Sequence, residues 1–247
     1  NAGFHLLADS SYGGESVLAN LPANCDLTSR LVLDARLHAA PGKRTPNAKG
    51  RPRKRGERLP NPEQMLKQRG RRITVDLYGR STRMRLVDAV ARVFRVPGRD
   101  LRVVATEALA GGRGREVFYS TQHTANAVMI LKWYAQRWSI EVTFHDSKQH
   151  LGFQEPQGWT RKAVERTAPT AMLLYGLITY WFATTGHKQF HRKIRPWYKR
   201  NRDASFREML ATLRYESIKQ QLFQLPLSGP GSKKIKQTLQ NLALLSV

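Results

Sequence analysis

The stretch Tyr134–Lys148, YAQRWSIEVTFHDSK, interleaves charged and aromatic side chains more closely than an ordinary surface helix does. The pattern predicts one long helix that Thr124 caps and that ends near Leu151, before Gly152. At about 100° per residue, five polar side chains of this helix fall within an arc of about 80°. They are Tyr134, Arg137, Glu141, His145 and Lys148.

Apolar side chains border this polar stripe on both sides, namely Trp138 and Val142 on one and Trp133, Ile140 and Phe144 on the other. The opposite face carries only small polar and acidic side chains and is the expected solvent face. We therefore expect the stripe to lie among buried side chains and to line a cleft. The residues alone leave two interpretations open.

The first interpretation is an ordinary ion pair between Arg137 and Glu141, worth roughly 0.2–0.5 kcal/mol on a helix surface. The second is a functional site. A carboxylate among Arg, Lys and Tyr side chains suits an anionic ligand, and a carboxylate facing phosphate needs a cation such as Mg²⁺ between them.

The overall charge favours a polyanionic partner. The 247 residues include 42 Lys and Arg against 18 Asp and Glu, a net charge of +24. Such a field attracts nucleic acid, since each neutralised phosphate releases counterions; a ribosome-associated or membrane-surface protein is the alternative. The single cysteine excludes an intrachain disulfide and a Cys-rich zinc site. The apolar run Ala171–Ala183 is shorter than the about 20 residues of a membrane span, so we expect a buried core helix and no membrane partner.

The rest of the chain predicts mixed α/β structure. Phe4–Ala8 is typical of a buried strand that ends at Asp9, and a turn and a short helix follow. The residues Ala39–Arg72 predict a basic loop, and the next fifty predict antiparallel strands. The expected elements are a helix at Glu15–Leu21, strands at Arg30–Leu37, Ile73–Tyr78, Arg83–Arg95, Leu101–Thr106 and Glu116–Tyr119, and helices at Pro169–Gly186 and Phe206–Phe223.

Two basic segments are candidate DNA contacts. Lys49–Arg55 has a Gly-Arg-Pro centre that is similar to an AT-hook, which lays Arg side chains such as Arg51 and Arg53 into a narrow minor groove. Lys188–Arg202 carries seven basic and no acidic residues with interleaved aromatic side chains, and Lys199 and Arg200 lie within it. The alternative for both segments is a solvated surface. We expect contacts chiefly to phosphates.

The spacing Tyr134-x2-Arg137-x3-Glu141-x6-Lys148 resembles the Y-(2)-R-(3)-E-(6)-K signature of insertion-sequence transposases of the broad IS4 kind. The wider stretch Trp133–Arg166 is similar to the IS701-like branch. The resemblance implies an RNase H-like α/β catalytic core in which three acidic residues bind two divalent ions, Mg²⁺ with Mn²⁺ as a substitute. It assigns the second and third acidic positions to Asp9 and Glu141.

The same resemblance implies roles for the other residues of the stripe. Arg137 and Lys148 would hold phosphates of the DNA, and Tyr134 would hydrogen-bond a phosphate or pack against a strand. It also implies a β-rich insertion before the helix that carries Glu141. The expected division is 1–38 as a partial core, 39–122 as basic loop and insertion, 123–186 as core helices and 187–247 as a basic helical segment.

Only eight residues precede Asp9, so we expect the core to be incomplete at its N-terminus and the first catalytic Asp to be missing. Asp34 and Asp76 are poor substitutes because they follow Asp9. Asp9 alone is also compatible with simple capping of a turn.

The expected function is metal-dependent cleavage and strand transfer at transposon ends by the intact protein, with the fragment inactive alone. The alternative is an inactive or domesticated DNA-binding remnant. Expected partners are double-stranded DNA and a second copy in a homodimer, in the nucleoid of a prokaryotic cytoplasm.

Overall fold

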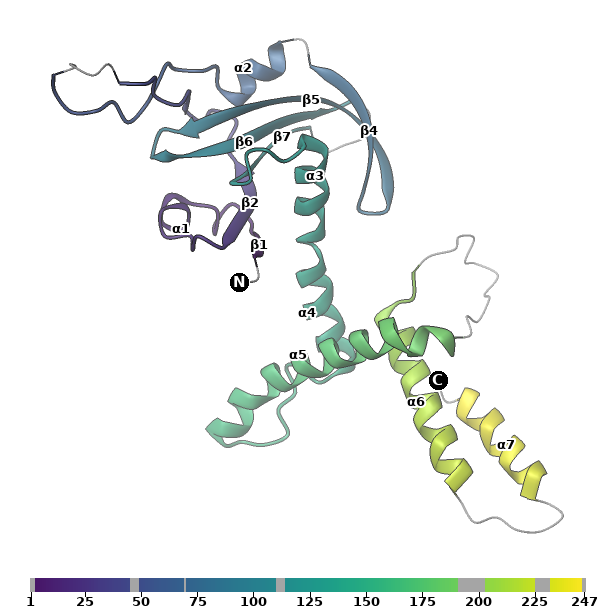
Figure 1. The fold of residues 1–247 in the computed structure, drawn as a ribbon. Coiled ribbons are helices and arrows are strands. Elements are labelled where there is room, and N and C mark those ends of the chain that lie inside the picture. Colours follow the sequence, from purple (N-terminus) through teal and green to yellow (C-terminus); the bar gives the residue numbers. More distant parts are fainter. Residues whose placement is uncertain are drawn as a thin grey trace. The chain divides into compact units, whose positions relative to one another are not determined.

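The computed structural model describes residues 3–44, 49–68, 70–109, 114–190, 203–224 and 232–245. They belong to two compact units, Asn1–Ser139 and Ile140–Val247 (Figure 1). The first unit contains a sheet and three helices: β1 (Phe4–Leu7), α1 (Glu15–Ala19), β2 (Cys25–Leu31), β3 (Leu37–His38), α2 (Pro62–Lys67), β4 (Arg71–Leu77), β5 (Arg80–Val93), β6 (Val96–Ala108), β7 (Arg115–Ser120) and α3 (Ala127–Gln136).

These strands form one seven-stranded sheet in the order β1-β2-β7-β6-β5-β3, with β4 paired to β5. The first two strands are parallel, with Leu6 opposite Leu27, and α1 connects them. The β-rich segment is continuous with them, because β7 pairs antiparallel with β2. The turn after β1 therefore lies next to β2, and β7 lies one strand further.

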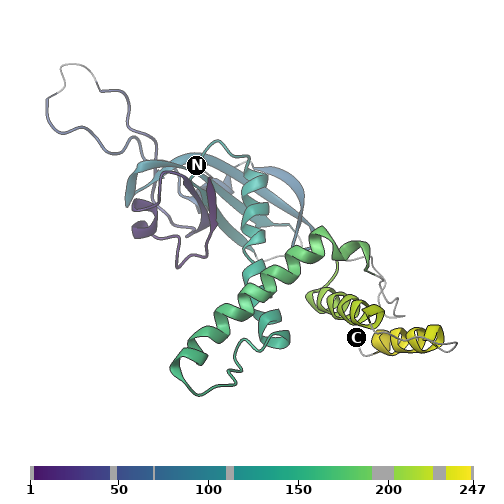
Figure 2. The same ribbon diagram turned by 60° about the horizontal axis from the view of Figure 1, so that its bottom comes forward.

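Helices cover both faces of this sheet, so its central strands are buried on two sides. On one face, Leu18 of α1 and Leu66 of α2 pack into a cluster with Leu27 and Val103. On the other, Ile130 of α3 packs into a cluster that includes Val104 and Phe118. Figures 1 and 2 show α3 lying along its face of the sheet. Adjacent residues of β6 point to opposite sides, as the alternation of a strand requires.

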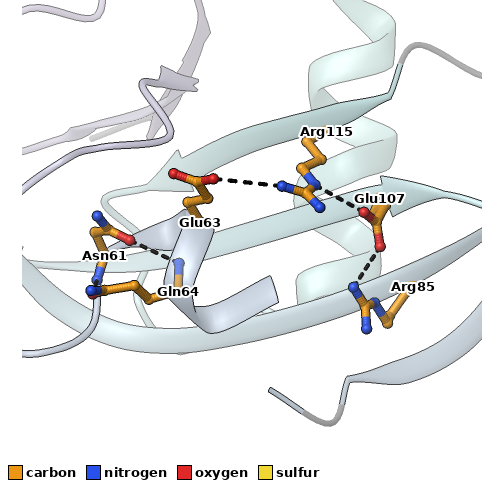
Figure 3. A network of polar contacts seen from close by, with 6 residues as sticks. All are labelled: Asn61, Glu63, Gln64, Arg85, Glu107 and Arg115. Carbon is orange, nitrogen blue, oxygen red and sulfur yellow. Dashed lines mark hydrogen bonds and ion pairs between the residues drawn. The ribbon is translucent and has the colours of Figure 1, made fainter. Parts of the chain in front are cut away.

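The predicted basic loop contains a helix that the sequence interpretation missed. Asn61 caps α2 by accepting from the Gln64 N–H, and the Gln64 side chain accepts from the Asn61 N–H. This reciprocal capping box stabilises even a short helix. In Figure 3, Glu63 of α2 reaches Arg115 at 3.6 Å, and Glu107 pairs with Arg115 at 2.9 Å. Glu107 also pairs with Arg85 on β5, so the network joins α2 to three strands.

The predicted second strand, Arg30–Leu37, was placed too late, since β2 begins at Cys25. Polar residues early in β2 hid the strand pattern. They are satisfied by partners distant in sequence: Asp26 accepts from the Thr121 hydroxyl at 2.8 Å, and Thr28 hydrogen-bonds His5 at 2.8 Å. Buried polar groups with such partners cost little.

The second unit is helical: α4 (Ser139–His150), α5 (Arg161–Thr184), the 3₁₀ turn η1 (Gly186–Lys188), α6 (Phe206–Gln224) and α7 (Ser232–Leu245). The helix predicted from Pro169 begins eight residues earlier, because Thr160 caps it and Arg161 pairs with Glu165 at 2.6 Å. Pro169 lies inside α5. The predicted helix from Phe206 is confirmed, and Phe206 stacks on Tyr175 with ring centroids 4.5 Å apart.

The prediction that α5 is buried on all sides is wrong. Leu173, Leu177 and Tyr180 are 63%, 54% and 70% exposed. They lie three to four residues apart and form one face of the helix, while Ala171, Ile178 and Phe182 form the buried face. An apolar composition thus did not determine which sides of the helix are covered. Among the described helices, none has the length and apolarity needed to cross a membrane.

Candidate functional site

The predicted long helix is two helices, with a tight turn at Arg137 and Trp138. The Arg137 N–H donates to the Tyr134 carbonyl at 3.1 Å, and the Trp138 N–H donates to the Ala135 carbonyl at 3.3 Å. These bonds span three residues instead of four, which tightens the chain. Asn126, rather than Thr124, caps α3 through the Val128 N–H. A single helical wheel therefore does not describe the whole stripe.

The first two residues of the stripe lie at the end of α3. Tyr134 is buried at 6% exposure and packs on Phe118 of β7, with ring centroids 4.8 Å apart. The Arg137 guanidinium lies 5.6 Å from the centre of the Tyr134 ring. Two roles were expected for Tyr134, a hydrogen bond to phosphate or packing against a strand, and the structure contains the packing contact with β7. The ring supports Arg137 by a cation–π contact.

The other three residues lie on α4. Glu141 is in its first turn, where a carboxylate interacts favourably with the N-terminal end of the helix dipole, and Lys148 is in its last turn. His145 is exposed, and its Nδ1 lies 3.1 Å from a carboxylate oxygen of Asp146. One helical face thus carries a carboxylate, an imidazole and an ammonium group.

The expected environment of this face is wrong. Four of the five residues flanking the stripe are exposed rather than buried: Trp138, Ile140, Val142 and Phe144 are 48%, 50%, 41% and 37% exposed. Trp133 on α3 is partly buried and packs against the cluster that includes Phe118, as expected. The presumed solvent face instead contains the fully buried Ser147, whose hydroxyl lies 3.8 Å from the Met172 sulfur of α5. This side of α4 therefore faces α5 at Ser147 rather than solvent.

Asp9 is the second residue after β1 and shapes the turn there. Its Oδ1 accepts from the Ser11 N–H at 2.8 Å and from the Tyr12 N–H at 3.3 Å. This is the Asx-turn geometry of the capping interpretation. A carboxylate has about four acceptor positions, so these two bonds leave capacity for a further ligand.

Neighbouring strands hold the Asp9 turn at two backbone carbonyls. The Ser29 hydroxyl of β2 donates to the Asp9 carbonyl at 2.8 Å, and the Tyr119 hydroxyl of β7 donates to the Gly13 carbonyl at 2.5 Å. Burial raises the pKa of Tyr119 to about 12, so its hydroxyl remains a donor even in alkaline solution. The turn is therefore fixed at its start and near its end.

Gly13 is required because the turn packs tightly against these two residues. A Cβ at Gly13 would overlap the Ser29 hydroxyl and would lie 2.6 Å from Ser29 Cβ and 2.9 Å from the Tyr119 hydroxyl oxygen. The sequence analysis did not identify Ser29 or Tyr119. Only the double glycine at 13–14 could have indicated close packing, without naming its partners.

The donor chemistry for a divalent cation consists of carboxylates. Asp9 and Glu141 offer the oxygen ligands that Mg²⁺ and Mn²⁺ prefer. They belong to different units, and each is placed only within its own. In the part of the chain that the structure describes, no group of three or more His, Cys, Asp or Glu residues is positioned to hold a metal ion.

The basic candidates outside the helices divide into two groups. Arg51 and Arg53 are exposed on the loop before α2. Lys199 and Arg200 lie outside the described residues.

A family model for the transposase DDE domain matches residues 2–177, which is most of the chain. The chain therefore belongs to the DDE transposase family. Membership implies an RNase H-like α/β fold, with which the mixed sheet and its helices agree, and a polynucleotidyl transferase that acts on DNA and uses divalent metal ions. No curated protein matches the chain.

Proposed function

We propose that this chain carries two of the three metal-binding carboxylates, Asp9 and Glu141, of an IS4/IS701-like transposase that cuts and joins transposon ends. The observation that supports this most strongly is the Asp9 turn. Its two carbonyl contacts come from β2 and β7, so the carboxylate is presented at a fixed place beside the sheet. A preorganised carboxylate of this kind suits metal-ion catalysis, which depends on fixed coordination geometry.

Asp9 and Glu141 would hold divalent ions, Mg²⁺ or Mn²⁺, which when bound activate the attacking water or 3′-hydroxyl and stabilise the leaving oxygen. The protein supplies the positions of the two carboxylates. Ser29 and Tyr119 hold the Asp9 turn. The first turn of α4 presents Glu141.

Arg137 and Lys148 would bind phosphates of double-stranded DNA. The Tyr134 ring restricts the Arg137 guanidinium, and a restricted guanidinium loses less entropy when it forms a bidentate contact with phosphate. Lys199 and Arg200 would add phosphate contacts at the basic segment that contains them. We further propose that the active form on DNA is a homodimer.

The third carboxylate would come from a strand paired beside β1. In the described part of the chain β1 is an edge strand, with β2 as its only neighbour in the sheet. Phe4 and Leu6 of β1 are 63% and 43% exposed, so an additional strand there would cover apolar surface. Its carboxyl end would lie near the Asp9 turn if it ran parallel to β1.

A second candidate function is DNA binding without cleavage. It is favoured by the net charge of +24, which is sufficient for binding to phosphates without any catalytic group. The two functions differ in one measurable respect, namely metal-dependent nicking of DNA. By itself this chain is expected to bind DNA and not to nick it.

The test uses the DNA that flanks the gene and the full-length gene product, with Mg²⁺ or Mn²⁺. Glu141→Gln should abolish nicking and leave DNA affinity within about twofold, because the substitution keeps the side-chain shape and removes only the anionic ligand. Glu155→Gln, an exposed acid of the same unit, is the matched control and should keep full activity. Equal nicking by the Glu141→Gln and control variants would exclude Glu141 from catalysis and with it the proposed site.

A further inference from the structure

The loop before α2 is a hairpin arm with a closed base. The Ala39 N–H donates to the Glu57 carbonyl at 2.8 Å, and the Gly56 N–H donates back to the Ala39 carbonyl at 3.0 Å. One step further, His38 and Arg58 form an antiparallel bridge. The chain therefore leaves the sheet after β3 and returns to the same place, and the described residues between, 40–44 and 49–55, extend away from the sheet (Figures 1 and 2).

The base of the arm is tightly packed. A Cβ at Gly56 would overlap the Ala40 carbonyl oxygen and would lie 2.9 Å from the Ala40 carbonyl carbon. Backbone cannot move away as a flexible side chain can, so only glycine fits. The returning segment of the arm at Gly56 is held directly against the outgoing segment at Ala40.

Arg55 fixes the returning strand to the turn between β5 and β6. Its guanidinium lies 3.7 Å from the centre of the Phe94 ring, and its Nε donates to the Phe94 carbonyl at 3.0 Å. The Phe94 N–H in turn donates to the Arg36 carbonyl at 2.9 Å. A stacked and hydrogen-bonded arginine of this kind is held more firmly than a surface lysine would be.

The residues beyond this anchor are exposed and only basic or neutral. Lys49–Arg55 contains five basic and no acidic residues, and all but Arg55 are exposed. Pro52 disfavours a helical conformation at Arg51 and fixes its own backbone, so less entropy is lost on binding. In an extended chain, Arg51 and Arg53 would be about 7 Å apart and about 17 Å or less from Gly56.

We propose that Lys49–Arg55 is an anchored arm that inserts Arg51 and Arg53 into the minor groove of A·T-rich double-stranded DNA, outside the catalytic site. A narrow minor groove, about 6 Å wide, has the enhanced negative potential that attracts arginine, and A·T tracts narrow it further. The segment lacks Asn, Gln and acidic side chains, so in the major groove its arginines and lysines could read only guanine, and they would then favour G·C-rich DNA. The Arg55–Phe94 contact is its positioning element.

The proposal for the arm depends on the proposed function only in that both concern DNA. The test is fluorescence anisotropy with the full chain and three duplexes of equal length: A·T-rich, G·C-rich and inosine·cytosine. The third has an A·T-like minor groove, without the guanine amino group, and a G·C-like major groove. The native chain should prefer the A·T-rich and inosine·cytosine duplexes equally over the G·C-rich duplex.

The double substitution Arg51→Ala, Arg53→Ala should abolish this preference and weaken A·T binding by about tenfold or more. The control Arg72→Ala, Arg80→Ala removes the same charge from exposed positions of the same unit and should weaken all three duplexes by one common factor. If the Arg51→Ala, Arg53→Ala variant also binds all three duplexes more weakly by the same factor, its arginines contact only phosphates and the minor-groove proposal is overturned. Unchanged affinity of this variant for all three duplexes would show that the arm does not contact DNA.

Substitutions at Phe94 test whether the arm must be held in place by Arg55 or contributes through its charge alone. Phe94→Tyr keeps the ring under Arg55 and should keep the A·T preference, whereas Phe94→Leu removes the ring and should reduce it without changing the net charge or the salt dependence. Equal preferences in the two variants would refute the positioning role. The Glu141→Gln variant should retain the A·T preference, so a failure of the catalytic proposal is distinguishable from a failure of the arm.

Discussion

Gly13→Ala tests whether the Asp9 turn is built against β2 and β7. The added methyl group would overlap the Ser29 hydroxyl and approach the Tyr119 hydroxyl oxygen to 2.9 Å. Tyr119 is fully buried in the sheet and cannot rotate away. Overpacking of this kind costs about 1–3 kcal/mol, and displacement of the Tyr119–Gly13 hydrogen bond adds about 1 kcal/mol. We expect the first unit to lose about 2–4 kcal/mol of its free energy of unfolding.

The adjacent Gly14 provides a matched control. A Cβ there meets nothing within 4 Å, and its backbone, with φ −77° and ψ 177°, suits any residue. Gly14→Ala should therefore change the unfolding free energy by less than about 0.5 kcal/mol.

The measurement is urea unfolding combined with hydrogen exchange at the Ala8 amide, which bonds the Thr28 carbonyl at 3.0 Å and reports on the first unit. Ser29→Ala in the Gly13→Ala background should recover part of the loss, because it removes the nearest clashing atom. A Gly13→Ala variant as stable as Gly14→Ala would refute the described packing of the turn.

Three further predictions concern pH and salt. The pKa of Tyr119 is raised to about 12, so between about pH 10 and 12 the folded state keeps the Tyr119 proton while the unfolded state loses it. The free energy of unfolding, measured in urea, should therefore fall as pH rises from about 10 to about 12. Tyr119→Phe should lack this component, and Tyr12→Phe at an exposed position should retain it. Hydrogen bonds from Arg115 and Arg85 hold the pKa of Glu107 below its ordinary value, so their stabilisation is complete above about pH 4.5 and is lost as pH falls through the lowered pKa. Glu107→Gln should remove this loss of stability at acid pH, and an unchanged loss would contradict the described network. Lys148→Gln should reduce the log–log salt slope of DNA binding by about 0.9, whereas Lys162→Gln should leave it unchanged.

Local chemistry was sufficient for several elements. The strand at β1 and the helix at α6 were predicted and are confirmed. The expectation that β1 is buried is wrong in the described chain, since Phe4 and Leu6 are 63% and 43% exposed. The spacing of Tyr134, Arg137, Glu141 and Lys148 indicated the transposase family, which the match over residues 2–177 confirms at the level of the DDE domain. The capping box of α2 was also local, and closer reading of Asn61-Pro62-Glu63-Gln64 could have found it.

The sequence determined the charge of the protein, its family signature and the elements whose caps and periodicity are local. The tertiary structure alone decided where β2 begins, which face of α4 packs on α5 and what holds the Asp9 turn. The physical reason is distance along the chain: Ser29 and Tyr119 contact the turn from 20 and 106 residues away. Pairing and burial of this kind depend on partners that no local pattern specifies, and they position the carboxylate that local pattern alone could only suggest.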